Sequence, residues 1–198
     1  FNQNQLGFTL DGVPLGDMSY ANHNGLHISR AILSENIGRV VLSQGTGALG
    51  TASTSNLGGT IQFYSDDPRD EFGVDLYGAT GSDEAQRVYA RLDSGETASG
   101  ARAFLSIATQ ETDKWKGAGT QEQEYANVKI VQPIGEAELS AYYSYSDRAE
   151  IDYHDMSHDM IGRLGQDWDN YFPDYARAVA AAQGNFTGDV ETLDDAYW

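Results

Sequence analysis

Cysteine is absent from this chain of 198 residues, and its absence excludes a disulfide framework and a thiolate metal site. Proline is scarce, with 4 residues, whereas 22 glycines and an excess of 12 tyrosines over 7 phenylalanines favour many strands separated by turns. No apolar run approaches the roughly 18 residues of a transmembrane helix, and the opening FNQNQLGFTL lacks the basic and apolar regions of a signal peptide. If the protein meets a membrane, we expect it to do so through strands.

Basic residues are also few, since 12 Lys and Arg stand against 30 Asp and Glu and leave a net charge of −18. A charge of this sign opposes a phosphate backbone, so we expect no nucleic-acid partner. Half of the excess lies in residues 147–198, where 12 acids and 3 arginines give −9 (3 − 12). We interpret this last stretch as a solvated loop region.

Motifs of catalysis are missing as well. The chain contains no H-E-x-x-H, no G-x-S-x-G and no cysteine nucleophile, so we predict that it is not an enzyme and needs no cofactor. Residues 45–50 match the nucleotide-binding pattern G-x-G-x-x-G after an apolar strand. That site requires a helix that begins in the loop, and Thr51 to Gly59 is too short and too rich in Ser, Thr and Gly to supply one.

The first 68 residues alternate short strand-like runs with long polar loops. Strands are predicted at Phe8 to Leu10, Ile37 to Leu42 and Thr60 to Tyr64, and a helical turn at Ile28 to Leu33. We expect the second and third strands to share one small sheet, with Gly58-Gly59 allowing a close backbone approach. Pro68 ends this pattern, and we place a domain boundary there.

Beyond Pro68 the chain changes to segments of about ten residues in which apolar and polar side chains alternate. These segments are Gln86 to Asp93, Ala101 to Gln110, Tyr125 to Gln132 and Glu138 to Asp147. Their length suits transmembrane β-strands, which need roughly 9 to 11 residues, but soluble sandwiches alternate in the same way.

The connections favour the membrane interpretation. Ser94 to Gly100 and Gln132 to Glu136 are short, whereas Glu111 to Glu124 and everything after Asp147 are long and polar. Short periplasmic turns and long extracellular loops alternate in this manner in outer-membrane barrels. We expect five or six barrel strands, and one helix from Pro173 to Gln183 in the last loop.

Four motifs in order resemble the TonB-dependent outer-membrane transporters. They are Asp11-Gly12-Val13-Pro14-Leu15, Ile37-Gly38-Arg39-Val40-Val41-Leu42, the loop with Gly45 and Leu49-Gly50-Thr51, and Leu57-Gly58-Gly59-Thr60-Ile61-Gln62-Phe63. In that family they belong to the C-terminal half of the plug domain. Gly38 and Val41 stand where the family usually has glutamates, a departure that affects its usual charge contacts between plug and barrel.

The resemblance implies a mainly β fold, with the C-terminal part of a plug at residues 1–68 and antiparallel strands of an incomplete transmembrane barrel at residues 69–198. It implies active uptake of a scarce nutrient, such as a metal chelate, vitamin or saccharide, across the bacterial outer membrane. The implied partners are outer-membrane lipid and the TonB-ExbB-ExbD complex, through a segment upstream of Phe1. Closed membrane barrels have at least about 8 strands, so we expect the natural protein to continue past Trp198.

A soluble or cell-surface β-rich ligand-binding module is the alternative from a different class. The same alternation of strands and turns is compatible with it. Fractionation of the full-length protein separates the two hypotheses, because a transporter stays with the outer membrane until detergent is added.

The resemblance also implies that two plug loops facing the cell exterior contact the substrate. They correspond to Asp17 to Asn24 and to Gly47 to Ser55, and plain solvation of both loops is the alternative. The candidate substrate-binding residues are Asp17, Tyr20, Asn22, His23, Asn24, Leu49, Thr51 and Ser53. They offer one aromatic face and several hydrogen-bonding groups, which suits a sugar or a chelate.

A repeated His-Asp-Met sequence at residues 154–160 gives a candidate metal site. Imidazole, carboxylate and thioether groups bind transition metals, and His154 and His158 would share a face if the segment were helical. A solvated loop is the alternative, because thioethers and carboxylates prefer different ions.

Overall fold

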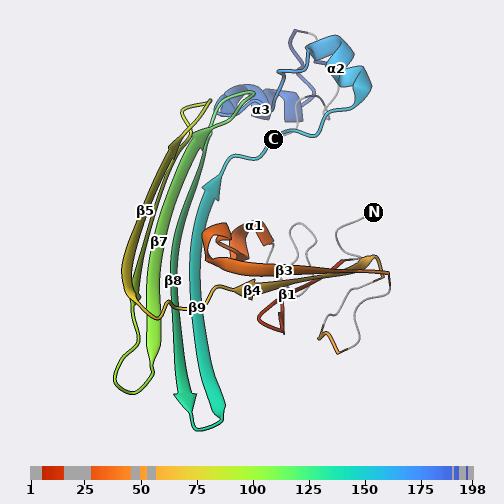
Figure 1. Cartoon of the computed structure of the whole chain (residues 1–198). Helices are drawn as coiled ribbons and strands as arrows, with labels where there is room; N and C mark the ends of the chain where they lie inside the picture. Colours follow the sequence, from red (N-terminus) through yellow and green to blue (C-terminus); the bar gives the residue numbers. More distant parts are fainter. Residues whose placement is uncertain are drawn as a thin grey trace. The chain divides into compact units, whose positions relative to one another are not determined.

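The computed structural model describes residues 6–15, 28–45, 50–52, 57–188, 190–191 and 195, with only the backbone of Ser29 and Arg30. The chain forms two sheets and several short helices (Figure 1). It divides into two compact units. The first comprises Phe1–Leu76, Tyr89–Ala108 and Tyr125–Asp147, and the second comprises Tyr77–Val88, Thr109–Glu124 and Arg148–Trp198.

The small sheet has four strands in the order β2-β1-β4-β3. The strands are β1 (Leu6–Leu10), β2 (Val13–Pro14), β3 (Ile37–Gln44) and β4 (Gly59–Ser65). β1 runs parallel to β4, whereas β3 is antiparallel to β4 with a bulge between Ile37 and Arg39. Before β3 come α1 (Ile28–Ala31) and the short 3-10 helix η2 (Ser34–Asn36).

The predicted pairing of the strands at residues 37 and 60 is confirmed, and so is the close approach after Leu57. Gly59 has φ of 134°, and a Cβ atom there would lie 2.6 Å from the carbonyl oxygen of Ser43 on β3. Only glycine fits this position without strain. Phe8 and Leu15 form the buried core beneath the sheet. Partly buried apolar residues packed against them are Leu6, Leu10, Ile28, Ala31, Ile32, Ile61 and Phe63.

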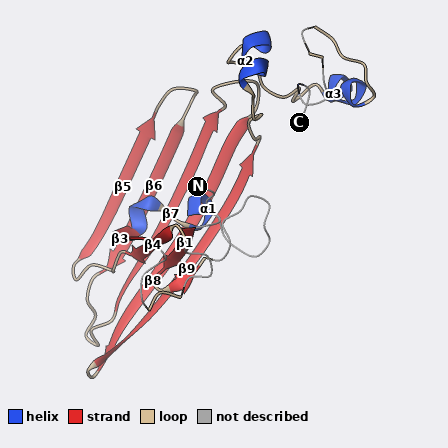
Figure 2. Ribbon diagram, turned by 90° about the vertical axis from the view of Figure 1, so that its right-hand side faces the viewer, coloured by secondary structure: helices blue, strands red, loops and turns tan. Residues whose placement is uncertain are grey.

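The large sheet has five strands in sequence order, β5-β6-β7-β8-β9, which lie side by side in Figure 2. They are β5 (Phe72–Thr80), β6 (Gln86–Ser94), β7 (Arg102–Asp113), β8 (Thr120–Ile134) and β9 (Ala137–Glu150). The predicted alternation is confirmed. On β6, for example, Tyr89 and Arg91 are buried while Val88 and Leu92 are exposed.

The long polar loop predicted at Glu111 to Glu124 is wrong. β7 continues to Asp113 and β8 already begins at Thr120, so residues 114–119 alone connect them. The end of β7 and the start of β8 were predicted as loop because neither face of either strand carries an apolar pattern there. Pairing between neighbouring strands satisfies their backbone groups whatever the side chains are. Likewise, the link from Gln132 to Glu136 shrinks to the two residues between β8 and β9.

The second unit contains two helices and a core of its own. α2 (His158–Leu164) and α3 (Tyr175–Ala182) begin at the side-chain caps Ser157 and Asp174, so the helix predicted at Pro173 to Gln183 is confirmed with shorter bounds. The core residues are Tyr171, Ala178, Ala181 and Val190, with Leu164, Trp168 and Phe186 against them. The described part of this acidic stretch is therefore a packed unit rather than the predicted solvated loop.

The β7–β8 turn belongs to the same unit and is tightly packed. A Cβ at Gly117 would lie 2.5 Å from Cβ of Asp169, and Gly117 has φ of 71°. Lys114 forms a buried ion pair with Asp169, whose carboxylate also accepts the backbone N–H of His154. Burial favours a higher pKa for Asp169, but these bonds hold its pKa below the ordinary value.

None of the described helices combines the length and apolar character needed to cross a membrane.

Candidate functional site

A polar interface joins the small sheet to the large sheet within the first unit. On one side lie Asn36 and the segment that leaves β4, residues 65–69. On the other lie the buried polar side chains of β6, β7 and β8, which alternate with exposed apolar ones. The two-residue period of a strand therefore points every second side chain at the interface.

Asn36 is the centre of the first part of this interface, and none of its surface is exposed. Its amide nitrogen donates to Ser106 Oγ at 2.7 Å and to Asn127 Oδ1 at 2.9 Å, and its oxygen accepts from Tyr89 OH at 3.0 Å. Asn127 extends this hydrogen-bond network to β9, because its amide nitrogen donates to Ser144 Oγ at 2.7 Å. Both donors of Asn36 and one lone pair are thus used, which satisfies a buried amide well.

Leu33 anchors the same segment by apolar contact. It is 1% exposed and packs with Tyr89, Ala108 and Tyr125 of the large sheet. One leucine is a small apolar anchor, worth about 1.5–3 kcal/mol when fully buried. The interface is consequently dominated by hydrogen bonds rather than by hydrophobic area.

Arg91 on β6 is the centre of the second part. Its guanidinium makes a bidentate contact with Asp93 at 2.8 and 2.9 Å, and it reaches Asp66 Oδ2 at 2.8 Å and the carbonyl of Asp67 at 3.0 Å. It also lies 4.1 Å from the ring centroid of Phe104. Arg91 is only 3% exposed, so its positive charge is buried. The hydrogen bonds and ion pairs of its planar guanidinium group compensate that charge.

Lys129 on β8 forms the third part. Its ammonium donates to Ser65 Oγ at 2.7 Å and pairs with Asp67 Oδ1 at 2.7 Å. The same serine donates its hydroxyl and its backbone N–H to Asp11 in the β1–β2 turn. Lys129 therefore ties the end of β4 and, through Ser65, the start of β2 to the large sheet.

The geometry accounts for the departure at Gly38 from the usual glutamate of the family. A Cβ at Gly38 would lie 3.2 Å from Oδ1 and 3.3 Å from Cα of Asp66, so a larger side chain would displace the carboxylate that binds Arg91. The acidic partners come from the segment after β4 rather than from β3. No local pattern in the sequence marks Asp66 and Asp67 as partners of Arg91 and Lys129.

Most of the predicted substrate-binding residues lie outside the described residues. This applies to Asp17, Tyr20, Asn22, His23, Asn24, Leu49 and Ser53. Thr51 is described, and its hydroxyl accepts a hydrogen bond of 3.0 Å from Gln62 on β4. The interface residues were not among the predicted site residues, although the alternation predicted over Gln86 to Asp93 places Tyr89 and Arg91 on the same face of the strand.

The predicted metal pair is not brought onto a helical face. His158 is the first residue of α2 and is exposed, whereas His154 precedes the helix and is buried. The carbonyl of His154 accepts from Lys116 at 2.8 Å. Among the described residues, no group of three or more His, Cys, Asp or Glu side chains has the arrangement of a metal site.

Solved structures of outer-membrane receptors match this architecture. The pyoverdine outer membrane receptor FpvA of Pseudomonas aeruginosa, bound to pyoverdine, is 20% identical with a TM-score of 0.55, and 72% of this chain covers 20% of that receptor. The chain has the fold of an outer-membrane receptor. The predicted resemblance to TonB-dependent transporters and the mainly β fold class are thereby confirmed at the level of fold.

Two further structures agree. The complex of FpvAI with pyocin S2 matches at 22% identity and a TM-score of 0.58, with 72% of this chain covering 18% of that one. The ferripyoverdine receptor of the outer membrane of Pseudomonas aeruginosa matches at 20% identity and a TM-score of 0.56. The match covers 72% of this chain and 19% of that receptor. No protein-family model and no curated protein matches the chain.

The chain spans about a fifth of the length of these solved receptors. The neighbours are receptors and not enzymes, in agreement with the prediction that this chain is not an enzyme. The likeness concerns the arrangement of strands, since the identity is at most 22% in these three structures.

Proposed function

We propose that this chain is the plug-to-barrel region of a receptor that takes up a metal chelate across the bacterial outer membrane in a TonB-dependent manner. In this proposal residues 1–68 are the C-terminal part of the plug, and residues 69–198 are the first strands and loops of the barrel. The energy comes from the TonB-ExbB-ExbD complex. Lipid surrounds the outer face of the sheet.

The polar interface is the observation that carries the proposal. A plug that must move during transport has to break its contacts with the barrel and form them again. Hydrogen bonds and ion pairs in a wet lumen exchange for bonds with water at a net cost of only about 0.5–1.5 kcal/mol each, whereas separated apolar faces lose their full burial energy. The bonds of Asn36, Arg91 and Lys129 suit a contact that is specific and reversible.

Arg91 shows how such a contact can separate without leaving an isolated charge. Its strongest partner, Asp93, lies two residues away on the same strand, so the ion pair stays intact when Asp66 departs. Breaking a buried ion pair by removing one partner costs about 3–5 kcal/mol. This arrangement avoids that cost on the barrel side.

The outer face of the large sheet supports placement in a membrane. Many of the alternate side chains there are apolar and exposed, including Leu76 at 79%, Leu105 at 48% and Leu139 at 61%. Further exposed apolar residues of this sheet are Phe72, Val74, Val88, Leu92, Ile107, Ile130 and Tyr143. An aqueous module would rarely expose so large an apolar surface, whereas lipid would cover it.

The metal chelate is favoured over a vitamin or saccharide because the similar receptors are bound to pyoverdine and ferripyoverdine. The plug loops at Asp17 to Asn24 and Gly47 to Ser55 remain our proposed contacts for the chelate. The partners of these neighbours include a protein, pyocin S2, so a large ligand is compatible with the same kind of receptor.

The test uses the full-length protein in a receptor-deficient bacterium. We expect it to fractionate with outer membranes, to require detergent for extraction, and to restore uptake of radioactive iron from ferripyoverdine only when TonB is present. A matched strain without TonB is the control. Recovery of the protein in the aqueous fraction contradicts the membrane assignment and favours the ligand-binding module, and uptake without TonB contradicts the energy source.

A further inference from the structure

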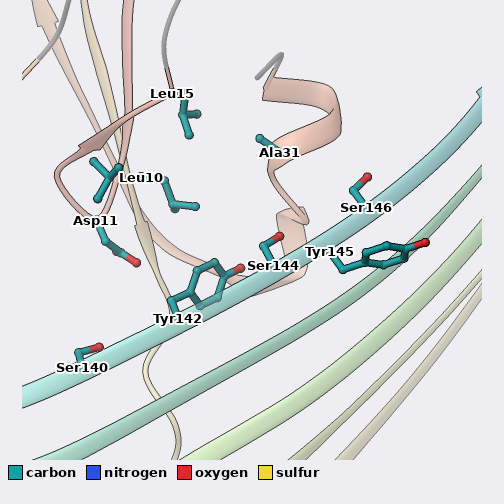
Figure 3. A pocket seen from close by; sticks show the side chains of 10 residues that line it. Leu10, Asp11, Leu15, Ala31, Ser140, Tyr142, Ser144, Tyr145 and Ser146 are labelled. Carbon is teal, nitrogen blue, oxygen red and sulfur yellow. The ribbon is translucent and has the colours of Figure 1, made fainter. Parts of the chain in front are cut away.

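A cavity of about 800 Å³ lies within the first unit beside β9, at the edge of the polar interface, with which it shares Asp11 and Ser144 (Figure 3). Ser140, Tyr142, Ser144 and Ser146 of β9 line one side of it. The other side is formed by Leu10, Asp11, Val13 and Leu15 of the β1–β2 region and by Ala31 of α1. Figure 3 shows Tyr142, Ser140 and Ser144 directed toward the side that carries Asp11 and Leu10.

The small sheet therefore bonds directly to some strands of the large sheet and is separated from β9 by the cavity. β6, β7 and β8 present long polar side chains that reach the small sheet, such as Arg91 and Lys129. β9 instead presents serines at alternate positions, and their short side chains leave the gap open. The size of the gap falls in the range of about 300–1,000 Å³ that small-molecule sites occupy.

The lining chemistry favours a hydrophilic organic solute over a bare ion. Asp11 is the one carboxylate among the described residues that line the cavity, and its oxygens already accept two bonds from Ser65. Three serines and two tyrosines, Tyr142 and Tyr145, supply hydroxyls that both donate and accept, while Leu10 and Leu15 supply apolar contacts. A bare hard cation would need several free oxygen ligands, whereas a chelate presents amides and hydroxyls that match this surface.

We propose that this cavity is an inner binding site for the transported chelate, distinct from the two predicted plug loops. The inference rests on the proposed function. In the resting receptor the solute bound here is held between β9 and the β1–β2 turn. Ser140 is the residue through which the site is best tested, because its neighbour Leu139 faces outward and provides a matched control.

The first experiment measures whether the cavity is open in the full-length protein. The chain has no cysteine, so Ser140→Cys and Leu139→Cys each introduce a single thiol, in a background freed of any others. We expect a hydrophilic maleimide to modify residue 140 at least about tenfold faster, since apolar surroundings that raise a thiol pKa by one unit remove nine-tenths of the thiolate. Equal rates, or an unreactive thiol at 140, would show that other parts of the chain fill the cavity and overturn the proposal.

The second experiment fills the cavity and measures transport. We expect Ser140→Trp to lower iron uptake from ferripyoverdine by about tenfold or more, the consequence of overpacking a site that a solute must enter. Leu139→Trp should leave uptake unchanged, and both variants should reach the outer membrane in equal amounts and bind ferripyoverdine at the cell surface. Normal uptake by Ser140→Trp overturns the site.

A wild-type receptor that takes up no iron from ferripyoverdine contradicts the proposed chelate and not the cavity. In that case the maleimide rates at residues 139 and 140 decide whether the cavity exists. Protection of the thiol at 140 by added ferripyoverdine, with no protection of the thiol at 139, is the direct sign of occupancy. Absence of protection in a receptor that does transport ferripyoverdine counts against the site.

Discussion

Replacement of Asn36 by alanine removes the centre of the polar interface. The variant loses the bonds to Ser106, Asn127 and Tyr89, which have lengths of 2.7, 2.9 and 3.0 Å. A typical hydrogen bond contributes about 0.5–1.5 kcal/mol net, so three bonds give about 3 kcal/mol. The loss is a lower bound if the partners stay buried without new bonds, since each unsatisfied group costs about 1–3 kcal/mol.

The assay follows detachment of the small sheet in the full-length protein. A fluorophore on Val13→Cys, where the side chain is 64% exposed, reports the environment of the β1–β2 turn during titration with urea. We expect Asn36→Ala to lower the free energy of detachment by about 3 kcal/mol, which raises the equilibrium constant for detachment about 150-fold. Ser34→Ala is the matched control, because Ser34 is exposed and its hydroxyl donates to the neighbouring Glu35.

A double-mutant cycle with Asn127→Ala then isolates the direct bond between the two amides. Residues in one buried network show coupling energies of about 0.5–3 kcal/mol, whereas independent sites add. A loss below about 0.5 kcal/mol for Asn36→Ala, or strict additivity in the cycle, would refute the view that this network holds the small sheet.

Further predictions concern the other contacts. Arg91→Lys should destabilise the same detachment transition by about 2 kcal/mol, because an ammonium that stays paired with Asp93 cannot also reach Asp66 and the carbonyl of Asp67, while Arg102→Lys, at an exposed ion pair, should change it by less than about 0.5 kcal/mol. Gly117→Ala should make the second unit sensitive to protease through its clash with Asp169, and Gly184→Ala in the same unit, with φ of 85° and nothing within 4 Å, is the control for backbone strain alone; equal sensitivity would rule out the clash. The lowered pKa of Asp169 should give the second unit stability that is complete above pH of about 3.9 and is lost as the pH falls through the folded-state pKa. Asp169→Asn should flatten this dependence in an acid titration of protease resistance, and an unchanged slope would contradict it.

The sequence by itself determined the strands and their faces. Alternation with a period of two follows from the geometry of an extended chain, so residues such as Val88 and Arg91 could be assigned to opposite faces before any partner was known. The glycine after Leu57 and the helix near Pro173 also carry local signals, a close backbone approach and a capped alanine-rich run. The order of four motifs indicated the receptor fold, which the solved structures confirm.

Only the tertiary structure decided what those faces contact. Asn36 meets Ser106 and Asn127 across sequence separations of 70 and 91 residues, and no local pattern encodes which polar side chain lies opposite another. Strand length past Glu111 was also undetermined, because partner strands rather than side-chain polarity satisfy the backbone there. The cavity beside β9 arises from the small size of Ser140 and its neighbours relative to the distance between two sheets, a distance that packing sets and a single strand cannot reveal.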